Sequence, residues 1–330
     1  MRVTLTPIAA RESYIAPVEK EIVAYFKETL FDPLTDLIGD SGVRTNAAHD
    51  EKHSAVWDAL LAGIIWYAAG VFSGTFNAAI SRELRAIGAI KRGAGFALAQ
   101  EDIPLPLKGA IALSIQRSTA LHEAVLSTLT RIEENLTAAP TGLNFTKAVD
   151  KITNDLQEQL VRSVSSVEGL PTPPPVSEGL TGQLREKLTQ GTERAVKDFT
   201  LEATQELRSL VRRNLSEGGR TDRLASIIEA RFGVAQRKAQ FLADQETSLL
   251  VSEFREQRYR ELGSTEYVWE TTGDAKVRPT HGESNDHRSL NGRRFSWDAP
   301  PVVDSASGRR CHPGQDYNCR CVARPILVFA

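Results

Sequence analysis

The sequence predicts a mainly α protein, in which an elongated multi-helix region is followed by a small C-terminal α+β module with short strands. Two observations carry this prediction. Apolar residues recur at intervals of three and four through most of the first 263 positions, which is the period of an amphipathic helix. From position 264 onward the pattern changes to polar–apolar alternation in "STEYVWETT", followed by segments rich in Gly, Pro, Asp and Asn.

An N-terminal helical domain is expected over residues 1–170. Residues 14–38 show the spacing of apolar and charged residues that is typical of a helix, and Pro33 is expected to break or kink that helix. An apolar stripe over residues 53–90 predicts a second helix, and residues 90–109 are expected to form a loop because they are rich in Gly and Pro. Two further stripes predict helices, and they consist of Leu121, Val125, Leu129, Ile132 and Leu136, and of Phe145, Val149, Ile152, Leu156, Leu160, Val164 and Val167.

The apolar run over residues 59–72 is 14 residues long, whereas about 20 are needed to cross a bilayer. We therefore expect a buried helix and no membrane association. The N-terminus has no apolar h-region, so no signal peptide is expected. A net charge of −2 excludes a polycation, and any nucleic-acid contact would need a local basic patch.

A Pro-rich linker is predicted at residues 171–179, because three consecutive prolines favour a stiff extended segment. A long-helix region is expected over residues 180–263. Within it, Thr221 is a candidate N-cap, and Gly233 and Gly263 are candidate helix ends. The remaining residues, 264–330, are predicted to form the small β-containing module.

All three cysteines lie between Cys311 and Cys321, within the last 20 residues of the chain. Thiolate and imidazole groups suit tetrahedral zinc, and the candidate ligands are His281, His312, Cys319 and Cys321, with Cys311 as a substitute for His312. Two alternatives stay open: a packed hairpin with cysteines as small apolar residues, or a redox switch. An unstrained disulfide between Cys319 and Cys321 is excluded by their spacing.

Two other groups of residues in the module could carry function. Asp274, Arg278 and His281 could pin an irregular loop through an Asp–Arg pair, or supply a general base. The basic residues Arg293, Arg294, Arg309 and Arg310 could contact a phosphate backbone of double-stranded DNA. Acidic residues are interspersed with them, so a solvated surface is the alternative.

Three segments, "YVWETTGDAKVRPTH", "LNGRRFSWDAPP" and "HPGQDYNCRC", together resemble the C-terminal signature of the phage Mu F-like head morphogenesis family. The resemblance covers roughly residues 220–327. The residues that carry the motif are Trp269, Asp274, Arg278, Asn291, Gly292, Pro313, Gly314 and Arg320.

The resemblance implies a non-catalytic minor head protein of a tailed phage or prophage, acting in head morphogenesis at or near the portal. It implies the portal protein and other head proteins as partners, and contact with packaged DNA in some members. The expected location is the virion, and the host cytoplasm during assembly. One branch of the family has Cys-x-x-Cys where this chain has Arg278 to His281. Some relatives carry a toxin domain after the signature, and none is expected after Ala330.

A metal-dependent nuclease of the His-Asn-His type is the alternative function. The segment "HGESNDHRSLNG" contains Asp286 and His287 as a candidate base and ligand. Pro300 and Pro301 follow closely and disfavour the strand–helix context that such a site needs.

Overall fold

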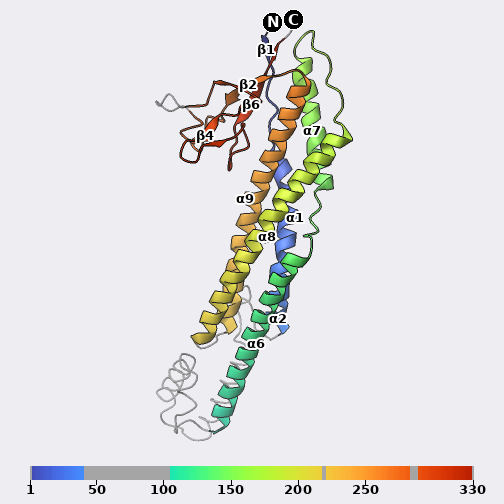
Figure 1. The fold of residues 1–330 in the computed structure, drawn as a ribbon. Helices are drawn as coiled ribbons and strands as arrows, with labels where there is room; N and C mark the ends of the chain where they lie inside the picture. The colour runs from blue at the N-terminus through green and yellow to red at the C-terminus, as the bar shows by residue number, and fades with distance from the viewer. Residues whose placement is uncertain (1, 41–104, 218–220, 283–288, 329–330) are drawn as a thin grey trace, which may run out of the picture. The chain divides into compact units, whose positions relative to one another are not determined.

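The computed structural model describes residues 2–40, 105–217, 221–282 and 289–328. It confirms a mainly helical fold followed by a C-terminal module of short antiparallel strands (Figure 1). The predicted helix over residues 53–90 lies outside the described residues, as does most of the predicted loop over residues 90–109. None of the described helices is long and apolar enough to span a membrane.

The chain forms two compact units, each assembled from separate stretches. Unit 1 contains residues 1–24, 142–196 and 237–330, and unit 2 contains residues 25–141 and 197–236. The boundary predicted at the Pro-rich linker, residues 171–179, stays a prediction.

The N-terminal helical region changes its winding just before Pro33. Helix α1 (Ile15–Phe26) continues into a π-helical turn (Lys27–Phe31) and then into α2 (Asp32–Asp40). Pro33 is the second residue of α2, and it has no N–H to donate to the preceding turn. A π-helical turn at this place accommodates the altered hydrogen bonding without ending the helical path.

Four long helices follow: α6 (Leu105–Ala138), α7 (Thr146–Ser165), α8 (Glu178–Ser216) and α9 (Thr221–Glu261). The loop predicted over residues 90–109 is wrong at its end, because α6 already begins at Leu105. Pro106 is tolerated there because the first turn of a helix does not need its N–H. The two predicted apolar stripes on α6 and α7 are buried except at Val167, which is partly exposed.

Helix α9 corrects the prediction that a helix ends at Gly233, because it runs through that residue without interruption. A glycine inside a helix costs only about 1 kcal/mol relative to alanine, and the burial of residues on both sides of Gly233 offsets this cost.

The predicted helix end at Gly263 is confirmed. Gly263 has a φ of +83°, the N–H of Ser264 reaches the carbonyl of Tyr259, and the N–H of Gly263 reaches the carbonyl of Arg260. These two bonds are those of a Schellman motif.

Unit 2 is a helical core with a buried polar pair. The rings of Phe26 and Phe199 lie 5.0 Å apart between centroids. The buried His122 places Nε2 2.9 Å from Nδ2 of Asn214 and Nδ1 2.6 Å from the carbonyl of Ser118. Both ring nitrogens of His122 therefore have partners, and burial lowers the pKa of this histidine.

The N-terminal segment of unit 1 is tied to α7 and α9 by polar contacts. Tyr14 donates a hydrogen bond to Asp155, and Arg11 pairs with the same carboxylate at 2.9 Å. Ser163 donates to the carbonyl of Thr6 at 2.8 Å. The residues that precede α1 are thereby held as an ordered strap.

The C-terminal module contains a four-stranded antiparallel sheet of order β1-β6-β2-β3. Its strands are β1 (Arg2–Thr4), β6 (Val322–Val328), β2 (Glu266–Glu270) and β3 (Arg294–Ser296). Pairing of β1 with β6 joins the two ends of the chain (Figure 1). Strand β1 was missed by the sequence analysis, because three residues are too few to show alternation.

A second sheet of two strands, β4 (Val302–Asp304) and β5 (Arg309–Arg310), completes the module. The strand predicted from "STEYVWETT" is confirmed as β2, and β3, β4 and β6 overlap the short apolar segments "RRFSW", "PPVV" and "CVARPILVF" of the predicted β-containing module.

Candidate metal centre in the C-terminal module

The core of the module is an aromatic cluster on one face of β2. Tyr267 and Trp269 are two positions apart on this strand, so they point to the same face, and both are fully buried. Each lies against one histidine: the ring of His312 is 5.5 Å from that of Tyr267, and the ring of His281 is 5.1 Å from that of Trp269. The two histidines therefore occupy different places in the core.

His281, Cys319 and Cys321 form a compact group whose potential ligand atoms all lie within 4.8 Å of one another. Nδ1 of His281 is 3.6 Å from the sulfur of Cys319 and 3.7 Å from the sulfur of Cys321. All three residues are buried, with at most 4% of each exposed. Two thiols and one imidazole that converge in this way could hold a metal ion.

Local structure explains why these three side chains meet. His281 ends a tight turn in which its N–H reaches the carbonyl of Arg278. Cys319 and Cys321 come directly before β6, which pairs with β2 from Glu270↔Val322 onward. The register of β6 thus places the two thiols beside the end of β2, where Trp269 and His281 pack.

Asp316 is the polar neighbour of the group, and its side chain is 1% exposed. One carboxylate oxygen lies 3.5 Å from Nε2 of His281 and 2.5 Å from a guanidinium nitrogen of Arg278, and the other lies 2.8 Å from Arg309. Nε2 of His281 has no hydrogen bond in the described part of the chain, and this carboxylate is the anion that faces it. A carboxylate behind a histidine is the arrangement that orients metal-binding imidazoles.

The pKa values of the two thiols are shifted in opposite directions. The pKa of Cys319 is lowered, first because the thiol of Cys321 can donate to its sulfur, and further because His281 lies beside it. The pKa of Cys321 is raised, because its proton is held by Cys319 and because it is buried. The pair therefore favours a thiolate at Cys319, which is the form that binds metals.

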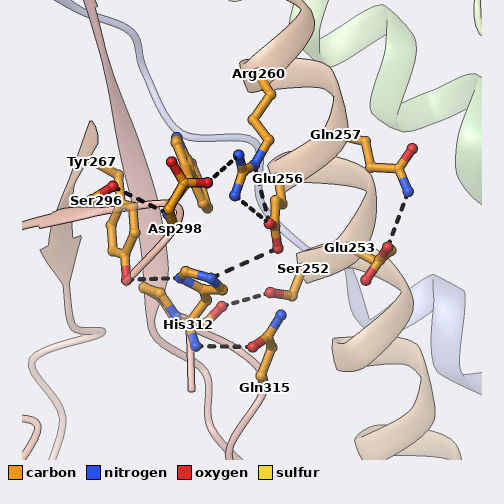
Figure 2. A network of polar contacts seen from close by, with 12 residues as sticks. Ser252, Glu253, Glu256, Gln257, Arg260, Tyr267, Ser296, Asp298, His312 and Gln315 are labelled. Atoms are coloured by element: carbon orange, nitrogen blue, oxygen red, sulfur yellow. Dashed lines mark hydrogen bonds and ion pairs between the residues drawn. The ribbon is translucent and has the colours of Figure 1, made fainter. Parts of the chain in front are cut away.

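His312, one of the predicted ligands, does not lie in this group. Its Nδ1 is 3.0 Å from the hydroxyl of Tyr267, and its Nε2 is 3.9 Å from a carboxylate oxygen of Glu256 on α9 (Figure 2). Burial lowers the pKa of His312. The structure thus brings together three of the four predicted ligands, and the substitute ligand Cys311 is a half-buried free cysteine.

The "HPGQDYNCRC" segment docks on α9 through Ser252 and Gln245. Ser252 donates to the carbonyl of Pro313 at 2.9 Å, and the backbone N–H of Asn318 donates to Gln245 at 2.6 Å. Gly314 has a φ of +88°, a conformation in which glycine is strongly preferred. The Pro-Gly turn therefore shapes the loop that carries the cysteines.

The predicted Asp274–Arg278 pair is not formed, because each residue has another partner. Asp274 pairs with Arg320 at 2.6 Å, and Arg278 pairs with Asp316.

The motif residues Asn291 and Gly292 form the turn before β3. The side chain of Asn291 accepts a hydrogen bond from the N–H of Thr271, and the N–H of Gly292, which has a φ of +75°, donates to the carbonyl of Trp269. The role of Asp316 was missed, since an isolated Asp in a polar loop has no distinguishing signal.

Of the four candidate DNA-contacting arginines, Arg293, Arg294 and Arg310 are exposed and Arg309 is partly buried. Arg293 and Arg294 are exposed on and beside β3. Arg309 is engaged with Asp316 and with the ring of Tyr317, and Arg310 donates to the carbonyl of Pro300 at 3.0 Å. The nuclease candidates Asp286 and His287 lie outside the described residues.

The fold and the site define a class: a helical protein with a small antiparallel C-terminal module built around a buried cysteine–histidine group. Residues 205–324 match the family described as phage Mu protein F like protein, and this segment belongs to that family. The matched range contains all of α9 and nearly all of the module. It also contains every residue of the candidate metal group.

A relative from Haemophilus influenzae, described as an uncharacterized protein, is 28% identical over 140 residues. The alignment covers 42% of this chain and 29% of the relative, so less than a third of that protein's length is shared. No solved structure matches the chain.

Proposed function

We propose that this protein is a non-catalytic minor head protein of a tailed phage or prophage, acting in head morphogenesis at or near the portal. The match of residues 205–324 to the Mu F-like family is the observation that carries the proposal. On this proposal its partners are the portal protein and other head proteins. The protein is present in the host cytoplasm during assembly and then in the virion.

The way the module is anchored supports a role in recognition by a rigid surface. Contacts from α9 that hold it include Ser252 with Pro313 and Gln245 with Asn318. They also include Arg260 with Asp298 at 2.8 Å (Figure 2). A surface that is fixed before binding loses less conformational entropy on association.

The direct test is deletion of the gene from the phage or prophage that encodes it, with complementation by the wild-type gene. We expect fewer DNA-filled heads by electron microscopy, and co-purification of the protein with the portal. Normal numbers of filled heads after deletion would overturn the proposal. So would divalent-metal-dependent DNA cleavage by the purified protein that is abolished in His287→Ala, because it would support the nuclease.

Contact with packaged DNA is a finer part of the proposal, and the exposed Arg293, Arg294 and Arg310 are its candidates. Binding through phosphates should be independent of sequence and should weaken as salt increases. We expect Arg293→Gln/Arg294→Gln to reduce both the affinity for a random duplex and its salt dependence, measured by fluorescence anisotropy. Arg309 is unsuited to this test because its neutralisation would remove a partner of Asp316. An unchanged salt slope would remove these two arginines from the DNA contact.

We also propose that the group of His281, Cys319 and Cys321 holds a structural zinc ion. A buried set of two thiolates and one imidazole suits zinc better than a hard cation such as magnesium. Elemental analysis of protein without a histidine tag should find about one zinc per chain and none in Cys319→Ser/Cys321→Ser. A metal-free wild type that keeps its module resistant to protease would leave the segment as a packed hairpin.

A further inference from the structure

We propose that the indole N–H of Trp269 donates a hydrogen bond to the sulfur of Cys321 when this sulfur is a metal-bound thiolate. Trp269 is then a positioning residue of the metal centre, because it contacts a ligand and not the metal itself. This role rests on the zinc ion proposed above, and it adds a donor that stabilises one of the two thiolates.

The register of the sheet places Trp269 and Cys321 on the same side. Trp269 is paired with Ala323 of β6, and directly opposed residues of an antiparallel pair share a face. Cys321 precedes Ala323 by two positions, so its side chain points to that face as well. Trp269 is completely buried, and Cys321 is 4% exposed. The indole and the thiol are therefore diagonal neighbours inside the core of the module.

The N–H of this indole is a buried donor without an acceptor. Within the described residues, Nε1 of Trp269 has no hydrogen-bond partner of normal geometry. The other buried tryptophan of the module differs, because Nε1 of Trp297 donates to the hydroxyl of Ser264 at 3.1 Å. A buried unpaired donor is destabilising, and such donors in folded proteins are rare. The N–H of Trp269 is thus available for an acceptor that its surroundings can supply.

The protonation state of Cys321 determines whether its sulfur is that acceptor. The pKa of Cys321 is raised, first by the bond that its thiol donates to Cys319 and then by burial, whereas the nearby side chain of Trp269 acts in the opposite direction. A neutral thiol is only a weak acceptor, and a charged thiolate is a much stronger one. Metal binding requires the thiolate. It therefore converts Cys321 into the acceptor that the indole lacks.

Trp269 also contacts the histidine of the same group. Its ring lies 5.1 Å from the ring of His281 in an edge-to-face arrangement, and Nδ1 of His281 is 3.7 Å from the sulfur of Cys321. One tryptophan therefore borders both the imidazole and a thiolate of the centre. A buried thiolate is costly unless it accepts hydrogen bonds, and the indole N–H reduces this cost. Loss of such a partner typically lowers metal affinity by about 10–100-fold.

The experiment compares full-length untagged wild type with Trp269→Phe and with the matched control Trp297→Phe. Both variants replace a buried tryptophan of the module by phenylalanine, but only the first removes the donor beside Cys321. Competition with a chromophoric chelator measures zinc affinity, and we expect Trp269→Phe to lose at least about 10-fold. In protein loaded with Co²⁺, its thiolate-to-metal charge-transfer band should move to longer wavelength, because an N–H···S bond stabilises the sulfur electrons that are excited.

Trp297→Phe should keep the band position of the wild type, since a change in packing alone does not alter the electrons of the sulfur. Circular dichroism shows whether each variant folds. If Trp269→Phe does not fold, nuclear magnetic resonance of the wild type decides, because the indole proton of Trp269 should move downfield when zinc is added.

Two outcomes would overturn the role of Trp269 while leaving zinc in place. They are an unmoved charge-transfer band in Trp269→Phe, or the same shift in both variants. An indole proton of Trp269 that does not respond to zinc has the same consequence. A wild type that binds no metal would refute the zinc site and this role together, and none of these results bears on the head-assembly test.

Discussion

Nε of Arg255 donates a hydrogen bond of 2.6 Å to the backbone carbonyl of Ile8, which is 247 positions away in the chain. The N–H of the same Ile8 donates to the hydroxyl of Tyr259 at 3.0 Å. Both backbone groups of one residue in the N-terminal strap are thus bonded to consecutive turns of α9. Arg255 is buried, and burial lowers its pKa, so its charge is retained at an electrostatic cost.

This relationship predicts that Arg255→Met destabilises unit 1. The variant keeps an apolar side chain of similar length but leaves the carbonyl of Ile8 buried without a donor, which costs about 1–3 kcal/mol. Urea unfolding followed by circular dichroism measures the free energy of unfolding. Arg237→Met is the matched control, since Arg237 is exposed on the same helix. Equal stability of the two variants would show that the Ile8 bond does not hold the strap.

Glu246 on α9 predicts a dependence of stability on pH. Burial raises its pKa to about 7, and a Cβ at Gly191 would lie only 2.6 Å from one of its oxygens. Its pKa in the folded protein is therefore higher than in the unfolded chain. Between the two pKa values, the folded state binds more protons, so the free energy of unfolding falls as pH rises from about 4.5 to about 7 and levels off above that.

We expect Glu246→Gln to flatten this decline, by on the order of 1 kcal/mol after allowance for solvent screening of a partly exposed side chain. Urea unfolding at pH 5 and at pH 8 gives the comparison. Glu202→Gln, at an exposed position of α8, should leave the decline as in the wild type. The same slope in Glu246→Gln and wild type would assign the decline to other groups.

Asp316 is predicted to act through His281 rather than as a ligand. If the zinc site exists, Asp316→Asn should weaken zinc binding by about 10–100-fold, because the amide no longer supports the imidazole as a charged acceptor. Chelator competition measures this affinity. Asp298→Asn, at an exposed position in the same module, is the control. Identical affinities for the two variants would mean that the carboxylate only balances the charges of Arg278 and Arg309.

Ser252 is predicted to anchor the cysteine loop on α9. Ser252→Ala removes the only hydrogen bond that the structure shows to the carbonyl of Pro313 in the described residues, and an unsatisfied buried carbonyl costs about 1–3 kcal/mol. Limited proteolysis of the module and the melting temperature should both report the loss. Ser209→Ala is the control, since the hydroxyl of Ser209 is exposed and bonds only within its own helix. A protease-resistant module in Ser252→Ala would place the anchor elsewhere.

Among the described residues, the sequence by itself was sufficient to predict the presence of the helices, their buried stripes and the β-containing module. These depend on local periodicity, as at Leu121 and Val125 on α6, or at Tyr267 and Trp269 on β2. The end at Gly263 was equally local, because a Schellman motif needs only a glycine at one position. Gly233 shows the limit of such signals, since the neighbouring buried positions of α9 outweigh one unfavourable residue.

Only the tertiary structure decided which side chains meet. Spacing alone could not separate His281 from His312 as a ligand, because their positions depend on the two aromatic residues of β2 against which they pack. The roles of Asp316 and Arg255, and the pairing of β1 with β6, likewise arise from residues far apart in the chain. Such contacts form when chain folding overcomes the entropy of closing long loops, and no local pattern in the sequence records that step.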